Sequence, residues 1–204
     1  DAFRMAVTEI KCNCGGKMSV TVPKQSFFYL ANAVEDKDLL EFGLNANTLV
    51  FIKSDMLFST RIISEPFMNI DRLLNMPDKM LVAKIKANDM KTMAETVSMI
   101  TNVSEDTAPV LLKFKNNNLQ LSIESTEAES TLNVPIESVN MISGEFYYNA
   151  KYFSDMLKVI RGDVDVYMTK RGILYASNPV SEYMLTNSKK RSVKRKSKKT
   201  KKAA

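Results

Sequence analysis

The chain has 204 residues, of which 45% are hydrophobic and 25% charged, a composition typical of a globular protein with one or two domains. It has no histidine and only two cysteines, which excludes Ser–His and Cys–His nucleophilic sites and leaves too few ligands for a tetrahedral zinc site. The net charge of +6 comes from the C-terminal end of the chain. Residues 189–202 hold ten Lys/Arg and no acid, whereas the rest holds 19 basic and 23 acidic residues, a net charge of −4.

Other signals of catalysis or targeting are also missing. The sequence has no glycine-rich phosphate-binding loop and no G-x-S-x-G turn. Glu124, Glu127 and Glu129 lie close together in SIESTEAES, but their spacing is typical of a solvated strand or turn and not of an acid–base pair. No apolar stretch approaches the ~20 residues of a transmembrane helix, and no signal peptide is recognisable. We therefore expect a cytoplasmic, non-catalytic protein with no cofactor, no metal and no membrane partner.

The chain opens with DAFRMAVTEIK, which alternates as the middle of a β-strand does and does not begin with Met. We expect it to be N-terminally truncated. Cys12 and Cys14 follow in KCNCGG, where the glycine pair indicates a turn. Two thiols could supply half of a metal site, but no other Cys or His can complete it. The pattern favours a loop with two free thiols in a reducing compartment.

An internal repeat runs through most of the chain. Short alternating strands are predicted at 17–22, 79–87 and 144–150, and their starts are 62 and 65 residues apart. A helix of roughly a dozen residues follows each strand, and two or three further strands follow each helix. One helix over an antiparallel sheet, repeated along the chain, predicts an α+β fold built of half-domains.

The three predicted helices are amphipathic with a period of 3.6 residues. Pro23 lies near the start of the first, where a missing N–H costs little; Asn88 or Asp89 can cap the second, and Asn149 the third, which Gly162 ends. Methionines in the stripes are better explained as core filling than as metal ligands, because flexible side chains suit irregular gaps. The apolar stripes are Phe27, Leu30, Ala31 and Val34; Met90, Met93, Ala94, Val97 and Ile100; and Phe153, Met156, Leu157 and Ile160.

Alternating strands around short turns predict three hairpins. Their turns lie at 54–55 in TLVFIKSDMLFSTRII, at 116–118 in LLKFKNNNLQLSIES and at 170–172 in VDVYMTKRGILYASNP. Residues 64–79 contain two prolines and little periodicity, which indicates an interdomain linker with a short helical turn at 69–74. The second and third copies of the repeat are contiguous and predict one complete two-helix domain, whereas the first copy lacks its partner half.

Several stretches of the chain are similar to those of one known family: DAFRMAV, SVTVPKQSFFYLANAV, DMLFSTRIISEPFMNIDRLLNMPDK, FYYNAKYFSDMLKVIRGDVDV and the strand at 182–185. In that family the first reads T-D-G-H-R-L-A-V, the second is a V-P-[RK] helix, and the third ends in [FY]-P-D-Y-x-x-[VL]-[IL]-P. Over nearly all of residues 1–186 the chain resembles the bacterial-type sliding clamp, the beta subunit of DNA polymerase III.

The resemblance implies a divergent clamp protomer that lacks its N-terminal part. Residues 1–66 would be the second half of the middle domain, 67–79 the interdomain linker and 80–188 the C-terminal domain, before a disordered basic tail at 189–204. Such a protein is a non-catalytic subunit of a DNA polymerase holoenzyme. It pairs with itself into a ring around duplex DNA, helices inside, with an interface here at Met99 and Ile100, and it works as a processivity factor at the nucleoid.

A sliding ring should attract phosphates without reading bases, since base contacts fix the register on DNA. Lys24 and Lys151 occupy equivalent positions at the starts of their helices, and Glu95 can neutralise Lys91 at i+4. An ordinary solvated surface remains an alternative for each lysine. The DNA-facing candidates are Lys24, Lys91, Lys151, Lys158 and Arg161.

The family also receives short extended peptides of polymerases and clamp loaders in an apolar pocket. Three departures from the family pattern indicate a pocket of altered shape and partner choice: Ala2-Phe3 replaces Gly-His, Met68 replaces a proline, and TNSKK replaces the terminal M-P-M-R-L. The matching pocket positions are Ala2, Phe3, Arg4, Met5, Met68, Arg72, Leu73, Met184, Leu185 and Thr186.

Two other hypotheses remain open. One is a clamp-derived protein that closes no ring and binds nucleic acid or recruits partners through its basic tail. Dense positive charge suits phosphates of nucleic acid or a membrane surface, a localisation signal, or no specific use beyond solubility. The other is an enzyme of unrecognised type, which the missing site chemistry disfavours.

Overall fold

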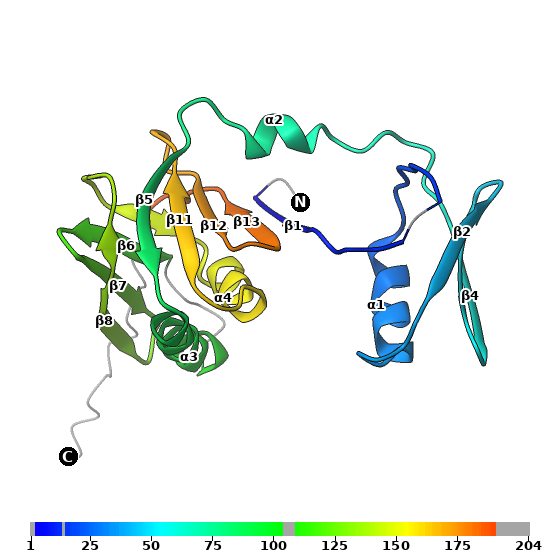
Figure 1. Cartoon of the computed structure of the whole chain (residues 1–204). Coiled ribbons are helices and arrows are strands. Elements are labelled where there is room, and N and C mark those ends of the chain that lie inside the picture. The colour runs from blue at the N-terminus through cyan, green and yellow to red at the C-terminus, as the bar shows by residue number, and fades with distance from the viewer. Residues whose placement is uncertain (1–2, 14, 104–108, 191–204) are drawn as a thin grey trace, which may run out of the picture. The chain divides into compact units, whose positions relative to one another are not determined.

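The computed structural model describes residues 3–13, 15–103 and 109–190, which form two compact units (Figure 1). The small unit is Cys12–Asp71, and the large unit combines Asp1–Lys11 with Arg72–Ala204. Ala2, Cys14 and residues 191–204 of the predicted tail lie outside the described residues. No helix in the described ranges is long and apolar enough to cross a membrane.

The large unit contains two antiparallel sheets. The first has six strands in the order β1 (Arg4–Thr8), β13 (Ser181–Leu185), β12 (Leu174–Ser177), β11 (Val164–Met168), β5 (Met80–Ile85) and β9 (Glu137–Ser138). The second has four, in the order β10 (Phe146–Tyr148), β6 (Val110–Lys115), β7 (Asn118–Glu124) and β8 (Glu129–Pro135).

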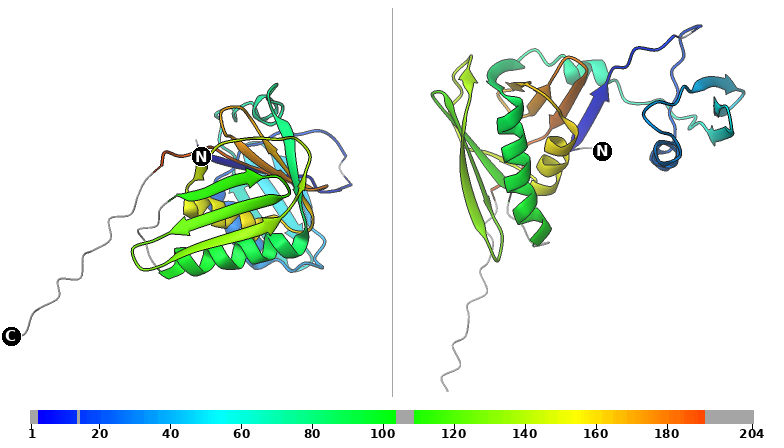
Figure 2. Two further views of the ribbon diagram at one scale, coloured as in Figure 1. Left: turned by 90° about the vertical axis from the view of Figure 1, so that its left-hand side faces the viewer. Right: turned by 60° about the horizontal axis from the view of Figure 1, so that its bottom comes forward.

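Two helices accompany these sheets. α3 (Ala87–Val103) packs on β7 and β8 of the four-stranded sheet, and Figure 2 shows it lying along that sheet. α4 (Ala150–Val159) contacts β13 of the six-stranded sheet, and it also contacts α3. The predicted α+β class with repeated helix-on-sheet halves is therefore confirmed for this unit.

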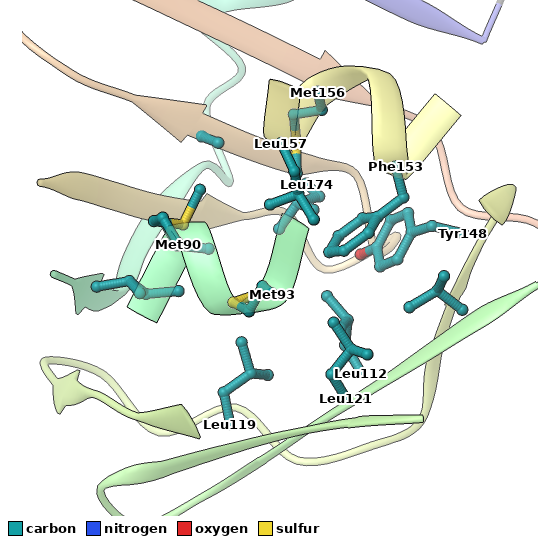
Figure 3. Packing of buried hydrophobic residues seen from close by; sticks show 14 of the residues in the cluster. Met90, Met93, Leu112, Leu119, Leu121, Tyr148, Phe153, Met156, Leu157 and Leu174 are labelled. Atoms are coloured by element: carbon teal, nitrogen blue, oxygen red, sulfur yellow. The ribbon is translucent and has the colours of Figure 1, made fainter. Parts of the chain in front are cut away.

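One continuous core joins both sheets and both helices of the large unit (Figure 3). Tyr148 is fully buried in it, and its hydroxyl donates a 2.9 Å hydrogen bond to the carbonyl of Gly172. Burial raises the pKa of Tyr148, so the phenol stays neutral. The predicted stripes of the second and third helices are confirmed as core. Ala94 is partly buried against it, and the other members are fully buried: Met90, Met93, Val97, Ile100, Phe153, Met156, Leu157 and Ile160.

The start of α4 is stabilised by a neighbouring side chain, whereas the start of α3 is stabilised by one that is distant in sequence. Asn149 caps α4 as predicted, since its Oδ1 accepts a hydrogen bond from the Tyr152 N–H at 3.1 Å. The predicted caps of α3, Asn88 and Asp89, instead lie inside its first turn. The α3 start is held by a carboxylate distant in sequence, because Asp163 accepts the Ala87 N–H at 3.0 Å. Sequence pattern alone could not identify that partner.

The helix ends and the hairpins agree closely with the pattern. α4 ends at Val159, Ile160 is extended, and Gly162 with φ +82° then turns the chain toward β11. The predicted turns between β6 and β7 and between β11 and β12 are confirmed. Asn116 in the first has φ +49°, and Gly172 in the second has φ +78°.

The small unit has one helix and one three-stranded sheet. α1 (Lys24–Ala33) accompanies β2 (Glu41–Asn45), β3 (Thr48–Lys53) and β4 (Met56–Arg61), with the predicted hairpin turn at 54–55. Its core cluster of buried residues is Leu30, Leu49 and Phe51. Of the predicted α1 stripe only Leu30 is buried, and Phe27 is 51% exposed. Within the described small unit, a single helix on three strands cannot cover the whole apolar face.

The predicted strand at 17–22 is not formed as such. Only Thr21 pairs, in an isolated bridge to Ile63, whose N–H donates to the Thr21 carbonyl at 2.7 Å. The corresponding strands of the large unit, β5 and β10, have neighbouring strands that satisfy their backbone groups. An alternating sequence becomes a strand only where such a partner is available.

The predicted division of the chain also differs from the observed units. The sequence predicts that residues 1–66 form one half-domain, but β1 pairs with β13 in the six-stranded sheet of the large unit. The short helix α2 (Ile70–Leu74) forms where the helical turn of the linker is predicted. From Arg72 onward the chain belongs to the large unit, so part of the predicted linker is built into that unit.

Replacing Leu157 by Asp should unfold much of the large unit, because its side chain is 3% exposed in the centre of the core. We expect a loss of about 3 kcal/mol or more, the order of magnitude for a buried unpaired charge. Urea denaturation followed by circular dichroism measures it. Val159→Asp is the control, since Val159 is 56% exposed on the same helix, and it should cost less than about 1 kcal/mol. Equal midpoints for the two variants would contradict the core assignment.

Candidate partner-binding site

The predicted pocket positions of the large unit lie mainly on and around β1 and β13. These strands pair from Arg4–Leu185 to Thr8–Ser181, and successive side chains point to opposite faces of the sheet. One face carries the core and α4; we call the other the outer face. Arg4 and Leu185 point to the helix face, whereas Met5 and Met184 point to the outer face.

On the helix face, Arg4 is held by α4. Its guanidinium forms an ion pair with Asp155 and lies 4.3 Å from the ring centroid of Tyr152. Phe3 stacks on the same ring with a centroid distance of 6.3 Å. Leu185 is 1% exposed and belongs to the main core, so no partner peptide can reach it in this conformation.

On the outer face, a row of large side chains crosses four strands. The register places Met5 beside Met184, Met184 beside Tyr175, and Tyr175 beside Tyr167. Met184 is 6% exposed and Tyr175 is fully buried, yet both lie outside the main core cluster of the described residues. Tyr175 is contacted on this face by another segment of the large unit.

That segment is residues 73–79. The hydroxyl of Tyr175 donates a 2.7 Å hydrogen bond to the carbonyl of Leu73. The ammonium group of Lys79 donates to the carbonyl of Leu74 at 3.0 Å and forms an ion pair with Glu182. Burial raises the pKa of Tyr175, so it remains a neutral hydrogen-bond donor.

The structure thus brings together only part of the predicted pocket. Leu73 is tied to Tyr175, the neighbour of Met184, which joins it to the Met5–Met184 row. Ala2 lies outside the described residues, and Met68 belongs to the small unit. Met184 and Leu185 are both buried in this conformation, so neither side chain lines an open groove.

Residues 186–190 form a strap from β1 to β10. The Thr186 N–H donates to the carbonyl of Phe3 at 2.9 Å, and the Ser188 N–H donates to the carbonyl of Tyr147 at 2.6 Å. Lys190 lies 3.8 Å from a carboxylate oxygen of Glu145. The first residues of the predicted tail therefore contact the folded unit, and the divergent TNSKK ending has a structural role.

Glu145 is the charged anchor of this strap. Its carboxylate accepts a hydrogen bond from Lys113 at 2.7 Å and another from the Tyr147 hydroxyl. These contacts lower the pKa of Glu145 to about 2. It therefore stays ionised across the physiological range and can hold Lys190 by charge.

The predicted DNA-facing side chains of the large unit are all exposed: Lys91, Lys151, Lys158 and Arg161. The predicted pairing of Lys91 with Glu95 is present at 3.9 Å. With Asp89 and Asp155 the two helices contain three acidic and three lysine side chains, and so no net charge. Lys24 begins α1 in the small unit, as predicted.

The two predicted interface residues fall into different environments. Met99 is 64% exposed on α3 and can contact another molecule. Ile100 is 8% exposed and packs in the core, so within this chain it fixes α3 to the rest of the large unit. The two residues differ although they are adjacent in sequence, because the side chains of neighbouring helix residues point about 100° apart.

Sequence reasoning missed the residues that hold the site in place. Tyr152 and Asp155 fix Arg4, while Lys79, Tyr175 and Glu182 fix the linker. Their partners lie up to about 150 residues away, so no local pattern marks them. Among the described residues, no group of three or more carboxylate, cysteine or histidine side chains is arranged to hold a metal ion.

Comparison with solved structures places this architecture among the DNA sliding clamps. The chain is similar to a DNA polymerase III beta subunit assigned in Eubacterium rectale, with a TM-score of 0.80 and 18% identity over 92% of this chain and 52% of that one. It is also similar to the beta sliding clamp of Caulobacter crescentus (TM-score 0.78, 16% identity, 93% and 52%) and to the DNA polymerase III beta subunit of Pseudomonas aeruginosa (0.76, 18%, 93% and 53%).

These likenesses establish the fold, which is that of the DNA clamps. The chain spans about half the length of the solved structures it matches. No protein-family model matches the sequence, and no curated protein sequence matches it. The arrangement of the elements therefore matches that of the clamps although the sequence identity to these structures is only 16–18%.

Met184→Lys should destabilise the large unit, because the new ammonium group would have to be buried on the outer face. We expect a loss of about 2 kcal/mol or more, measured by urea denaturation. Met68→Lys is the matched control, since Met68 is 53% exposed, and it should change stability by less than about 0.5 kcal/mol. An unchanged midpoint for Met184→Lys would contradict the burial of this side chain.

Proposed function

We propose that this chain is part of a DNA sliding clamp, a non-catalytic processivity factor that surrounds duplex DNA and tethers a replicative DNA polymerase. The observation that carries the proposal is the match of the chain to a DNA polymerase III beta subunit, with a TM-score of 0.80 over 92% of this chain. Two helix-on-sheet halves share one core in the large unit, which agrees with it. Under this proposal residues 80–188 are the C-terminal domain, and most of 1–66 is half of the middle domain.

The charge of the helices supports sliding and not sequence-specific binding. Lys91, Lys151 and Lys158 offer exposed cations, but an equal number of acidic residues on α3 and α4 limits their attraction for phosphate. Weak, sequence-independent attraction lets a protein move along DNA, whereas tight base contacts would stop it. We propose that these lysines, with Lys24 and Arg161, face the DNA.

Tethering requires a partner site away from the DNA-facing helices, and the outer face supplies a candidate. A polymerase peptide bound near Arg72, Leu73 and Met5 would convert repeated rebinding to DNA into an intramolecular event at high effective concentration. Short peptides concentrate their binding energy in a few apolar anchors. Met5, which is only partly buried and belongs to the row that continues to Tyr175 beside Leu73, suits such an anchor.

Ring closure needs contacts between protomers. Exposed apolar side chains on a helix are suited to this, and we propose that Met99 lies at a subunit interface. A replication protein of this kind would act on chromosomal DNA, at the nucleoid. Clamp-loader subunits would use the same peptide site as the polymerase, since one apolar groove can receive related extended peptides.

The peptide proposal predicts that Leu73→Asp weakens binding of the cognate polymerase's C-terminal clamp-binding peptide at least about tenfold, because a charge would replace an apolar contact at the site. Fluorescence anisotropy of the labelled peptide with the full chain measures the dissociation constant. Leu39→Asp is the matched control, since Leu39 is 91% exposed in the small unit. Equal affinity for both variants would place the partner site elsewhere.

A second candidate function rests on the basic tail. Ten Lys/Arg follow a body with a net charge of −4, so most attraction for DNA can come from residues 189–202. In this case the chain would bind nucleic acid electrostatically through its tail, without closing a ring.

Deleting residues 189–204 should weaken binding to a DNA duplex and reduce its salt dependence. Each phosphate that the tail neutralises adds about 0.9 to the steepness of log K against log salt, and the tail could neutralise up to about ten phosphates. Filter binding between about 50 and 200 mM salt measures the slope. A tail with the same composition in scrambled order should behave as the wild type, and a deletion with unchanged affinity and slope would exclude the tail from DNA binding.

Closed circular DNA separates the two candidates. A ring is linked to the circle and remains on it when high salt removes electrostatic contacts, but it leaves once the DNA is linearised. A tail-bound protein leaves the circle in high salt. Retention of the full chain together with its clamp loader on circular DNA alone would support the clamp, and loss from both forms would support the tail.

A further inference from the structure

The linker end of the large unit is fixed by one compact group of side chains on the outer face. Lys79 lies 4.5 Å from the ring centroid of Tyr175 and 5.1 Å from that of Tyr167, and its ammonium group pairs with Glu182. Lys79 also donates to the carbonyl of Leu74. The three strands β11, β12 and β13 thus hold one lysine of the segment that precedes β5.

These contacts satisfy a specific need of the backbone. α2 ends at Leu74, and the last carbonyls of a helix have no partner within the helix. The Tyr175 hydroxyl donates to the Leu73 carbonyl at 2.7 Å, and the Lys79 ammonium donates to the Leu74 carbonyl at 3.0 Å. A cation at this end is also favoured by the helix dipole.

The side chains of this group are largely shielded from solvent, so their contacts can contribute to stability. The side chains of Lys79 and Glu182 are only 16% and 21% exposed, so their pairing is less screened by solvent than a surface ion pair. Between two aromatic rings, the lysine gains further attraction from their π faces. Removing the lysine alone would leave a half-buried carboxylate without its partner.

We infer that Lys79, with Tyr175 and Glu182, is a positioning residue that holds residues 73–79 against Tyr175, beside the Met5–Met184 row, and so forms the partner site before any partner arrives. The inference rests on the proposed peptide-binding function. A preformed site binds its partner more tightly, because binding then does not have to offset the conformational entropy lost when the segment becomes ordered. Without the lysine, residues 73–79 should detach from the sheet more often, and the peptide should meet a less ordered surface.

The test uses Lys79→Met in the full chain, which keeps the aliphatic stem and removes the charge. We expect the labelled polymerase peptide to bind about tenfold more weakly, and backbone amides of residues 73–79 to exchange hydrogen faster while those of β12 and β13 stay unchanged. Lys79→Arg keeps the charge and should recover most of the affinity. Lys84→Met is the matched control, since Lys84 is an exposed lysine of β5.

The double variant Lys79→Met with Glu182→Gln separates positioning from general stability. It removes the unpaired carboxylate, so its urea midpoint should return toward that of the wild type, whereas peptide affinity should stay about tenfold lower. Wild-type affinity in this double variant, or unchanged amide exchange in Lys79→Met, would overturn the inference and leave the clamp proposal standing. If the wild-type chain itself does not bind the peptide, the proposed partner site fails, and this inference fails with it.

Discussion

The antiparallel pairing of β1 with β13 joins the beginning of the described chain to its end, and the arrangement of the candidate site depends on it. Because side chains alternate between the faces of a sheet, this register directs Arg4 to Asp155 on α4 and Met5 to the outer face beside Met184. A slip of one residue would exchange these environments. It would place the guanidinium over an apolar row and a methionine against a carboxylate, so burial and charge both select the observed register.

The two units show what the repeated motif requires to be stable. In the large unit, the helices α3 and α4 each close one side of a shared core, and residues such as Met93 and Leu157 become almost fully buried. In the small unit one helix lies with three strands, and Phe27 and Phe28 remain more than half exposed. A half-domain thus has the hydrogen bonds of its sheet but only part of the apolar burial that stabilises a folded domain.

Polar contacts in the large unit serve mainly to position segments. Asp163 holds the start of α3, Tyr175 holds the end of α2, and Glu145 holds the strap that leads to the basic tail. Each of the three lies in a strand or directly before one, and holds a helix end or loop that is distant in sequence. The helices α3 and α4, in contrast, carry equal numbers of acidic and lysine side chains, as the proposed sliding on DNA requires.

The sequence by itself determined the elements: its periodicity located three helices and three hairpins, Asn149 marked a cap, and the repeat indicated an α+β fold of half-domains, while the resemblance to a known family implied the clamp architecture. Local pattern suffices there because hydrogen bonding and amphipathicity act over a few residues. Only the tertiary structure decided that β1 joins the large unit, that Asp163 holds the start of α3, that Met184 is buried, and that Lys79 fixes the end of the linker. These outcomes depend on which strand finds which neighbour, and pairing between residues more than 70 positions apart leaves no trace in local composition.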